Sequence, residues 1–157
     1  MAHELAQVNV SRLRFPTDAP EMVGFLAALR RVNRTAEQSP GFIWRLAGVG
    51  DHLNGADLVG DDRVSLNLSV WTSYQRLHDY AHRSEHGLFV RQRARWFERV
   101  PLPATALWWV PAGRRPTPEE ALARLAYLRA NGPSPRAFTV RCRFTPQGRR
   151  ETRFQRV

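Results

Sequence analysis

Residues 64–99 decide the fold, and they read VSLNLSVWTSYQRLHDYAHRSEHGLFVRQRARWFER. The first eight alternate: every second side chain is Val or Leu, and those between them are Ser65, Asn67, Ser69 and Trp71. Because successive side chains of a strand point to opposite faces, this period of two predicts a half-buried strand over 64–71. One face of that strand is hydrocarbon. The other carries two hydroxyls, a carboxamide and an indole, which favours contact with water or with a polar cavity.

Helical sequence follows this strand. Thr72 or Ser73 can cap the first turn, since a hydroxyl there accepts from N–H groups that have no helical partner. A second helix is expected from Ser84, with one stripe of side chains at spacings of three and four. Its members are His86, Phe89, Val90, Arg93, Trp96 and Phe97. A histidine and an arginine on an otherwise apolar stripe need partners, and the polar face of strand 64–71 is the nearest candidate.

Periodicity and turn residues predict the remaining elements. They are a strand over 4–11, a helix over 20–38, a strand over 41–48, a loop over 49–62, a strand over 104–113, a capped helix over 117–130 and a short strand over 137–144. The first of these strands has Gln7 and Asn9 on one face. The second, by simple alternation, has Phe42, Trp44 and Leu46 together on one face.

The first four strands and two helical regions follow the order β-α-β-β-α-β, which predicts an α+β, ferredoxin-like antiparallel sheet. An extra helix and a short strand follow at the C-terminus. We expect one domain over 1–135 and a basic strand and tail over 136–157. Helices would cover one face of the sheet and leave the other bare, so a homodimer with two sheets face to face is the economical arrangement.

The net charge of +10 suggests nucleic acid as a partner, but two observations argue against this interpretation. All 24 basic residues are arginine, and they are unevenly distributed along the chain. Residues 136–157 hold seven arginines against Glu151, which leaves 17 arginines against 13 acidic residues in the rest of the chain. A basic tail by itself attracts anionic partners only weakly, so we do not expect nucleic-acid binding. The role of the tail stays open.

Several classes of protein are disfavoured by composition. No apolar run approaches the ~20 residues that span a bilayer, and the N-terminus lacks the layout of a secretory signal, so a cytoplasmic protein without membrane contact is expected. One cysteine, Cys142, precludes an internal disulfide. His78, His82 and His86 would share a face only in an unbroken helix, and a turn is expected at Ser84, so no metal site is predicted.

Four phrases together resemble a known superfamily. They are AQVNV at 6–10, NLSVW at 67–71, WTSYQRLHDYAHRSEH at 71–86 and WWVPAG at 108–113. In these words and in the order of its elements, the chain resembles the dimeric α/β-barrel superfamily of antibiotic-biosynthesis monooxygenases. Within it, residues 3–135 are most similar to the branch catalogued as domain of unknown function 3291.

The resemblance implies roles for particular residues. In cofactor-independent quinol oxygenases of the superfamily, an asparagine and a tryptophan four apart line the pocket with a helical arginine; Asn67 and Trp71 match the first two, and Arg93 is our choice for the third. Haem-degrading members use a first-strand asparagine, matched by Asn9, and a histidine that ligates iron. Arg91 occupies the place of that histidine, so the chain departs from the haem-binding pattern.

We therefore predict a pocket between the sheet and the helices. Its catalytic residues would be Asn67, Trp71, His86 and Arg93, and its substrate-binding residues Gln7, Asn9, Trp44, Ser69 and Trp96. Amide groups could stabilise charge that develops on a substrate oxygen, His86 could act as a general base, and tryptophans would enclose an aromatic ring.

The predicted function is that of a cofactor-independent, monooxygenase-like enzyme acting on an aromatic or polyketide-type small molecule, with a cyclase or isomerase as a variant. No cofactor is expected. The alternative is a non-catalytic ligand-binding or haem-binding module of the same fold. For each polar residue taken alone, a buried side chain that hydrogen-bonds its neighbours explains the sequence better than a site does; for the set together, a shared site is the better explanation.

Overall fold

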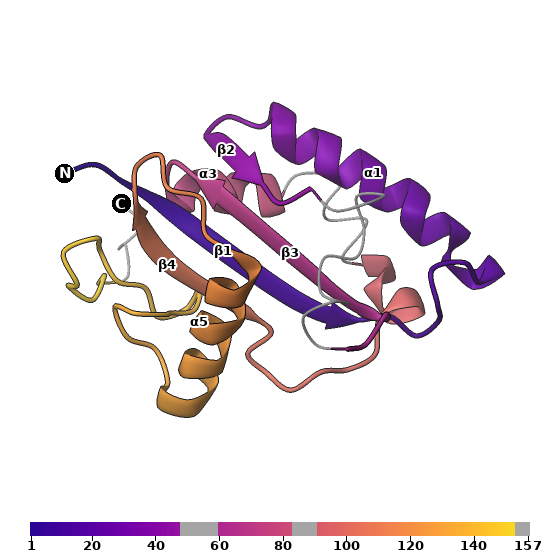
Figure 1. Ribbon diagram of the computed structural model, residues 1–157. Coiled ribbons are helices and arrows are strands. Elements are labelled where there is room, and N and C mark those ends of the chain that lie inside the picture. Colours follow the sequence, from indigo (N-terminus) through magenta and orange to yellow (C-terminus); the bar gives the residue numbers. More distant parts are fainter. Residues whose placement is uncertain (48–59, 83–90, 153–157) are drawn as a thin grey trace.

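The computed structural model describes residues 1–47, 60–82 and 91–152, and its centre is a four-stranded antiparallel sheet. The strands are ordered β2-β3-β1-β4 (Figure 1). Their bounds are β1 His3–Arg12, β2 Phe42–Arg45, β3 Val64–Trp71 and β4 Thr105–Pro111. The helices are η1 Pro20–Met22, α1 Val23–Gln38, α3 Tyr74–Ala81 and α5 Pro118–Asn131, and residues 91–96 are also helical. The predicted α+β, ferredoxin-like fold is confirmed.

Local sequence explains where the helices begin. Ser73 caps α3, because its Oγ accepts a hydrogen bond from the backbone N–H of Arg76 at 3.3 Å. Thr117 caps α5 in the same way through the N–H of Glu120 at 3.1 Å, with Pro118 at the first helical position. The sequence predicted a capped start at Thr117, and for α3 it left Thr72 and Ser73 as two candidates, of which the structure selects Ser73.

The apolar face of the sheet is covered within the chain by α5 (Figure 1). The side chains of this layer are almost fully buried: Ala6, Val8, Leu66, Leu68, Val70, Ala106, Trp108 and Val110 from the strands, and Ala121, Leu125 and Leu128 from α5. The expectation of a bare face was therefore wrong. The pattern of α5 showed that one side of it is apolar, but not which surface that side would cover.

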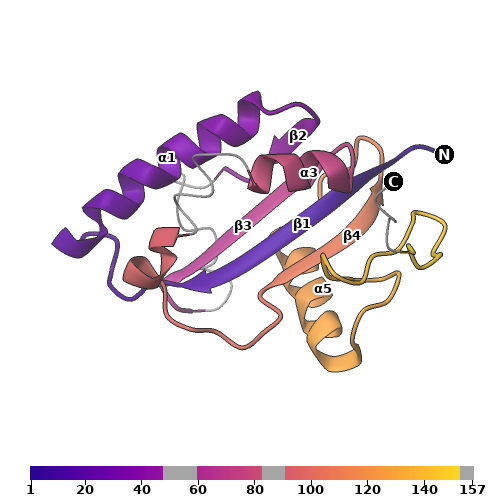
Figure 2. The ribbon, with the colours of Figure 1, turned by 180° about the vertical axis from the view of Figure 1, so that it is seen from behind.

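The opposite face of the sheet packs beneath α1 and α3 (Figure 2). This is the polar face predicted from the sequence, with alternate residues of β1, β3 and β4 turned toward these helices. Asn9 on β1 lies directly opposite Asn67 on β3, and Gln7 lies opposite Ser69. The register therefore brings the predicted carboxamides and hydroxyls together in one layer.

A bulge in β2 overturns the predicted face for Trp44. Phe42 pairs with Trp71, but Trp44 pairs with Val70, so the residue between them is extra. Because a bulge shifts the alternation by one residue, Phe42 stays on the polar side of the sheet while Trp44 packs against the apolar layer beside α5.

The strand predicted over 137–144 is not formed, and isolated bridges and turns take its place. Phe138 exchanges two backbone hydrogen bonds of 2.9 Å with Leu107 on the edge of β4, but this is an isolated bridge. Beyond Phe138 the backbone turns to local hydrogen bonds in place of pairing with β4. For example, the N–H of Cys142 donates to Thr139 Oγ1 at 3.1 Å. The boundary predicted at residue 135 remains a prediction.

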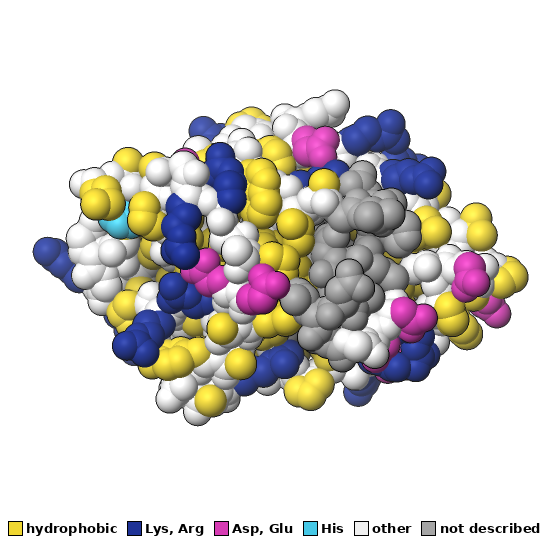
Figure 3. All heavy atoms as spheres, viewed as in Figure 1, with side chains coloured by type: hydrophobic (Ala, Val, Ile, Leu, Met, Phe, Trp, Pro, Cys, Tyr) yellow, Lys and Arg dark blue, Asp and Glu magenta, His cyan; other side chains and the backbone are white. Residues whose placement is uncertain are grey.

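Charge on the surface is mixed. Figure 3 shows arginine and acidic side chains interspersed over the face that carries α5. Several arginines are paired, for example Arg114 with Glu120 at 2.9 Å and Arg143 with Glu151 at 2.8 Å. Among the described helices, none is long and apolar enough to cross a bilayer.

Candidate functional site

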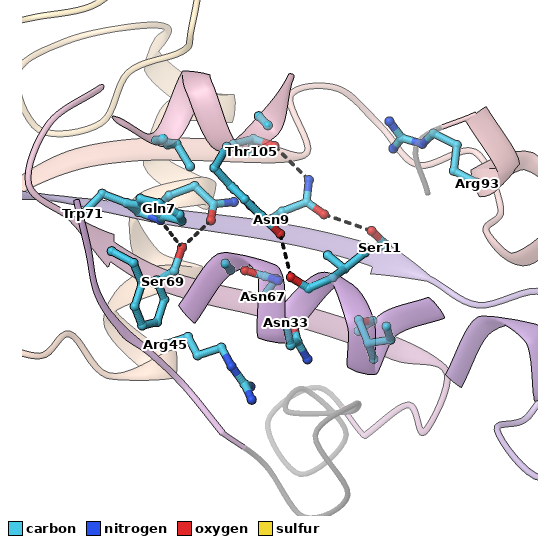
Figure 4. Close-up of a pocket in the computed structure, with 18 of the residues that line it drawn as sticks. Gln7, Asn9, Ser11, Asn33, Arg45, Asn67, Ser69, Trp71, Arg93 and Thr105 are labelled. Carbon is cyan, nitrogen blue, oxygen red and sulfur yellow. Dashed lines mark hydrogen bonds between the residues drawn. The ribbon is translucent and has the colours of Figure 1, made fainter. Parts of the chain in front are cut away.

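A cavity of about 320 Å³ lies between the polar face of the sheet and helices α1 and α3. Its volume is at the lower end of the range for small-molecule sites. The polar or charged side chains on its wall are Gln7, Asn9, Ser11, Asn33, Arg45, Ser65, Asn67, Ser69, Arg93 and Thr105. The aromatic ones are Phe25, Phe42, Trp71, Tyr80 and Phe97. The cavity thus combines flat apolar walls with a polar floor (Figure 4).

One end of the polar floor is internally satisfied. The indole Nε1 of Trp71 donates to Ser69 Oγ at 3.0 Å, and Ser69 Oγ donates to Gln7 Oε1 at 2.9 Å (Figure 4). The ring of Trp71 stacks on Tyr80, with centroids 5.1 Å apart, and meets Phe42 edge-on at 5.4 Å. These contacts hold Trp71 in one orientation, so it forms a rigid wall.

Asn9 is engaged in a second chain of hydrogen bonds. Its Nδ2 donates to Thr105 Oγ1 at 2.8 Å, and its Oδ1 accepts from Ser11 Oγ at 3.1 Å (Figure 4). Both ends of the carboxamide therefore have protein partners. Asn9 and Ser69 are thus bonded to neighbouring side chains of the floor, and Gln7 is bonded through its oxygen.

Asn67 differs from its neighbours. It lies opposite Asn9 at the centre of the floor, is exposed, and makes no hydrogen bond to any described residue. The side chain of Arg93 likewise reaches the cavity wall without a hydrogen bond or ion pair to a described residue. Both side chains can offer N–H donors to a ligand without first breaking a hydrogen bond to a described residue, and so can the amide nitrogen of Gln7, whose oxygen alone is bonded to a described residue, Ser69.

Arg93 is positioned by the way its segment joins the sheet. The N–H of Phe97 donates to the carbonyl of Arg93 at 2.8 Å, and Phe97 forms an antiparallel bridge with Leu13 just beyond β1. The backbone N–H of Glu98 donates to the carbonyl of Arg12 at 2.8 Å, which fixes the segment further. The end of β1 therefore anchors the helical turn that carries Arg93.

Arg45 is a lining residue that the sequence reasoning missed. The bulge in β2 places it opposite Ser69, on the cavity side, where its side chain is only 14% exposed. Its Nε donates to Glu37 Oε1 at 2.7 Å. A four-residue strand leaves too little alternation to reveal a bulge, so no signal in the sequence identified this residue.

Tyr80 lines the cavity as a neutral hydroxyl. Burial raises the pKa of its phenol far above the ordinary value, and the charge of Arg45 opposes this rise only in part. Its hydroxyl donates to the carbonyl of Val32 at 3.2 Å. Tyr80 is therefore a donor and a stacking surface, and it is unsuited to act as a base near neutral pH.

Six of the nine residues predicted for the site line this cavity: Gln7, Asn9, Asn67, Ser69, Trp71 and Arg93. Two do not. Trp44 packs beside the apolar layer, and Trp96 packs against Phe25, with ring centroids 5.7 Å apart, in a cluster with Leu13 and Met22. His86 lies outside the described residues. The roles assigned to these residues remain predictions.

The described lining residues offer little to a metal or a haem iron. No group of three or more His, Cys, Asp or Glu side chains able to hold a metal is found among the residues the structure describes. No histidine, cysteine or methionine lines the described wall of the cavity, and the Tyr80 hydroxyl already donates to a carbonyl. These residues do not fit haem ligation.

With this geometry in hand, comparison identifies the family. Residues 4–154 match the family described as Domain of unknown function (DUF3291). The chain belongs to this family. No curated protein matches the sequence.

Solved structures of known proteins share the fold. One is a candidate antibiotic biosynthesis monooxygenase from Nitrosomonas europaea, with a TM-score of 0.51 and 16% identity; the match covers 74% of this chain and 96% of that one. SnoaB, a cofactor-independent oxygenase from Streptomyces nogalater, matches with a TM-score of 0.49 and 16% identity over 74% of this chain and 99% of its own. At such identities, likeness shows the fold and leaves the activity of this DUF3291 protein to be argued from its site.

Proposed function

We propose that this DUF3291 protein is a cofactor-independent, oxygenase-like enzyme that acts on a small aromatic or polyketide-type substrate in the cavity beneath α1 and α3. The observation that carries the proposal is the carboxamide of Asn67, which makes no hydrogen bond to any described residue. It lies on the same face of β3 as Trp71, in a floor where Asn9 is hydrogen-bonded at both ends of its carboxamide and Gln7 accepts through its oxygen. A carboxamide that is accessible on the wall of a cavity and unpaired among the described residues is suited to a ligand.

The chemistry follows from the donors. A phenolic substrate in this cavity would place its oxygen at Asn67, whose N–H group would stabilise the negative charge that forms when the phenol loses its proton. The guanidinium of Arg93 would add positive charge to the same region. Oxygenation of such a phenolate by O2 yields a quinone and water: one oxygen atom enters the ring, the other leaves as water, and the substrate supplies all four electrons.

The base that takes the phenolic proton is not among the described lining residues, since these include no carboxylate or histidine. His86, outside the described residues, is our proposal for it.

Because α5 covers the apolar face of the sheet within the chain, the reason given for the homodimer expected from the sequence no longer holds. A homodimer through another surface remains a prediction of the resemblance alone.

The test is oxygen uptake with two- and three-ring phenols and anthrones, measured with an oxygen electrode alongside the appearance of quinone absorbance. Asn67→Ala should lower the rate about 10²- to 10³-fold without changing the melting temperature. Asn131→Ala, the same substitution at an exposed position at the end of α5, is the matched control. Ligand binding without oxygen uptake would favour the non-catalytic binding module. An unchanged rate in Asn67→Ala would refute the role of this residue.

A further inference from the structure

The C-terminal segment, whose role the sequence leaves open, contributes to the wall of the cavity. Among the described lining residues, Val140 is the one that comes from beyond β4. After α5 the chain returns to the β4 edge of the sheet, where Phe138 exchanges two backbone hydrogen bonds of 2.9 Å with Leu107 (Figure 2). Leu107 is itself a lining residue, so Val140 stands at the β4 end of the cavity.

The backbone at Val140 is held in place by Arg143. The Nη1 of Arg143 donates to the carbonyl of Val140 at 2.8 Å, and its Nε donates to Glu151 Oε2 at 2.8 Å. The same guanidinium lies over the ring of Tyr74 on α3, with Cζ 3.9 Å from the ring centroid, where a cation is attracted by the aromatic face. Arg143 thus ties Val140 to the first turn of α3, so this part of the wall has a fixed position.

The end of the cavity at Val140 is largely apolar. Leu77 of α3 and Leu107 of β4 line the cavity as well, and both pack in one cluster with Phe138. The hydroxyl of Thr105, the other lining residue of β4, accepts a hydrogen bond from Asn9 at 2.8 Å. Val140 is 47% exposed, so it contacts solvent as well as the cavity and marks a place where the cavity opens to the surface.

The register gives the distance from the reacting position to this end of the cavity. Asn67 lies opposite Asn9 on β1, and Asn9 lies opposite Thr105 on β4. Two strand spacings of ~4.8 Å therefore separate Asn67 from β4, which is about 10 Å. Two or three linearly fused aromatic rings extend over such a distance. A phenol with its oxygen at Asn67 would bring the far end of that framework to Val140.

We propose that Val140 is a specificity-determining residue that sets the length of the aromatic framework the cavity accepts. This proposal rests on the proposed function, because it places the phenol oxygen at Asn67. It narrows the substrate class to phenols whose framework ends in an apolar ring or alkyl group on the β4 side. A strongly polar group there would lie against Leu77, Leu107 and Val140 and lose its hydrogen bonds to water.

The experiment measures the binding of 2-naphthol and of 6-phenyl-2-naphthol by calorimetric titration. The two probes share the phenol end and differ by one ring at the far end. Val140→Trp should weaken binding of the longer probe about 10-fold or more and leave binding of the shorter one unchanged. Val140→Ala should tighten binding of the longer probe relative to the shorter one. Val23→Trp is the matched control, because Val23 is 67% exposed at the start of α1 and does not line the cavity.

Thermal unfolding shows that folded proteins are compared, since substitution at so exposed a position should leave the melting temperature unchanged. A ratio of the two affinities in Val140→Trp equal to that of the wild type would overturn the role of Val140 and leave the proposed function standing. The expected change of ratio in a protein that takes up no oxygen with either probe would refute the oxygenase and leave Val140 as a determinant of ligand length. Binding of neither probe by the wild-type protein would refute the aromatic site together with the role of Val140.

Discussion

The packing of α5 predicts a large and specific loss of stability when Leu125 is truncated. Leu125 is 2% exposed and lies in the apolar layer that α5 forms with β1, β3 and β4. Removing a buried leucine side chain to Ala costs ~2–5 kcal/mol. Since the neighbours of Leu125 in this layer are themselves almost fully buried, the space would refill poorly, and we expect about 3 kcal/mol. For a domain of this size, that corresponds to a fall in melting temperature of roughly 6–12 °C.

The assay is thermal unfolding followed by circular dichroism, at several protein concentrations and with light scattering for the molar mass. Leu102→Ala is the matched control, because Leu102 is 85% exposed and its truncation should change little. If α5 covers the apolar face within one chain, the loss of stability in Leu125→Ala should be the same at every protein concentration, whether or not two chains pair through another surface. The reasoning fails if Leu125→Ala is no more destabilising than Leu102→Ala.

Two further predictions concern the turn before β2 and the ion cluster at the end of β1. Gly41 has a φ of +84°, and a Cβ there would collide with the side chain of Arg76. Gly41→Ala should therefore lower the free energy of unfolding by about 2 kcal/mol, measured by chemical denaturation. A denaturation curve equal to that of the wild type would contradict this. Arg12 bonds Asp61 and Glu98, each at 2.8 Å, and thereby lowers the pKa of both carboxyls below their ordinary values. At a pH above the ordinary pKa values, the cluster therefore stabilises the fold in full. This stabilisation is lost as the pH falls through the lowered pKa values of the folded protein, so the melting temperature should drop from pH 5 to pH 3. Arg12→Met should flatten that drop, and an equal drop in both proteins would rule the cluster out as its source.

Much of the architecture could be predicted because it depends on local pattern. Alternation over 64–71 placed β3 at its observed bounds, and the hydroxyls of Ser73 and Thr117 marked the starts of two helices. The same alternation predicted that Asn67, Ser69 and Trp71 share a face. Such predictions succeed because the period of a strand and the capping of a helix are set by neighbours in the chain.

The wrong prediction for Trp44 shows that local alternation does not reveal a bulge, which depends on pairing with another strand. Alternation placed Trp44 with Phe42, but the bulge between them is fixed by pairing with β3, some 25 residues further along the sequence. The same shift turned Arg45 into the cavity. Trp96 was expected at the site because it shares a helical stripe with Arg93, yet it packs against Phe25, which only the docking of α1 could bring there.

The sequence by itself therefore determined the kind of elements, their order and the existence of a polar strand face. The tertiary structure decided which polar groups on that face satisfy one another and which remain for a ligand. Asn9 and Asn67 are both carboxamides on neighbouring strands, but among the described residues Asn9 alone of the two finds partners, in Ser11 and Thr105. The physical reason is that hydrogen bonds between side chains depend on distances of a few tenths of an ångström across strands, and these distances exist only once the sheet and its covering helices have assembled.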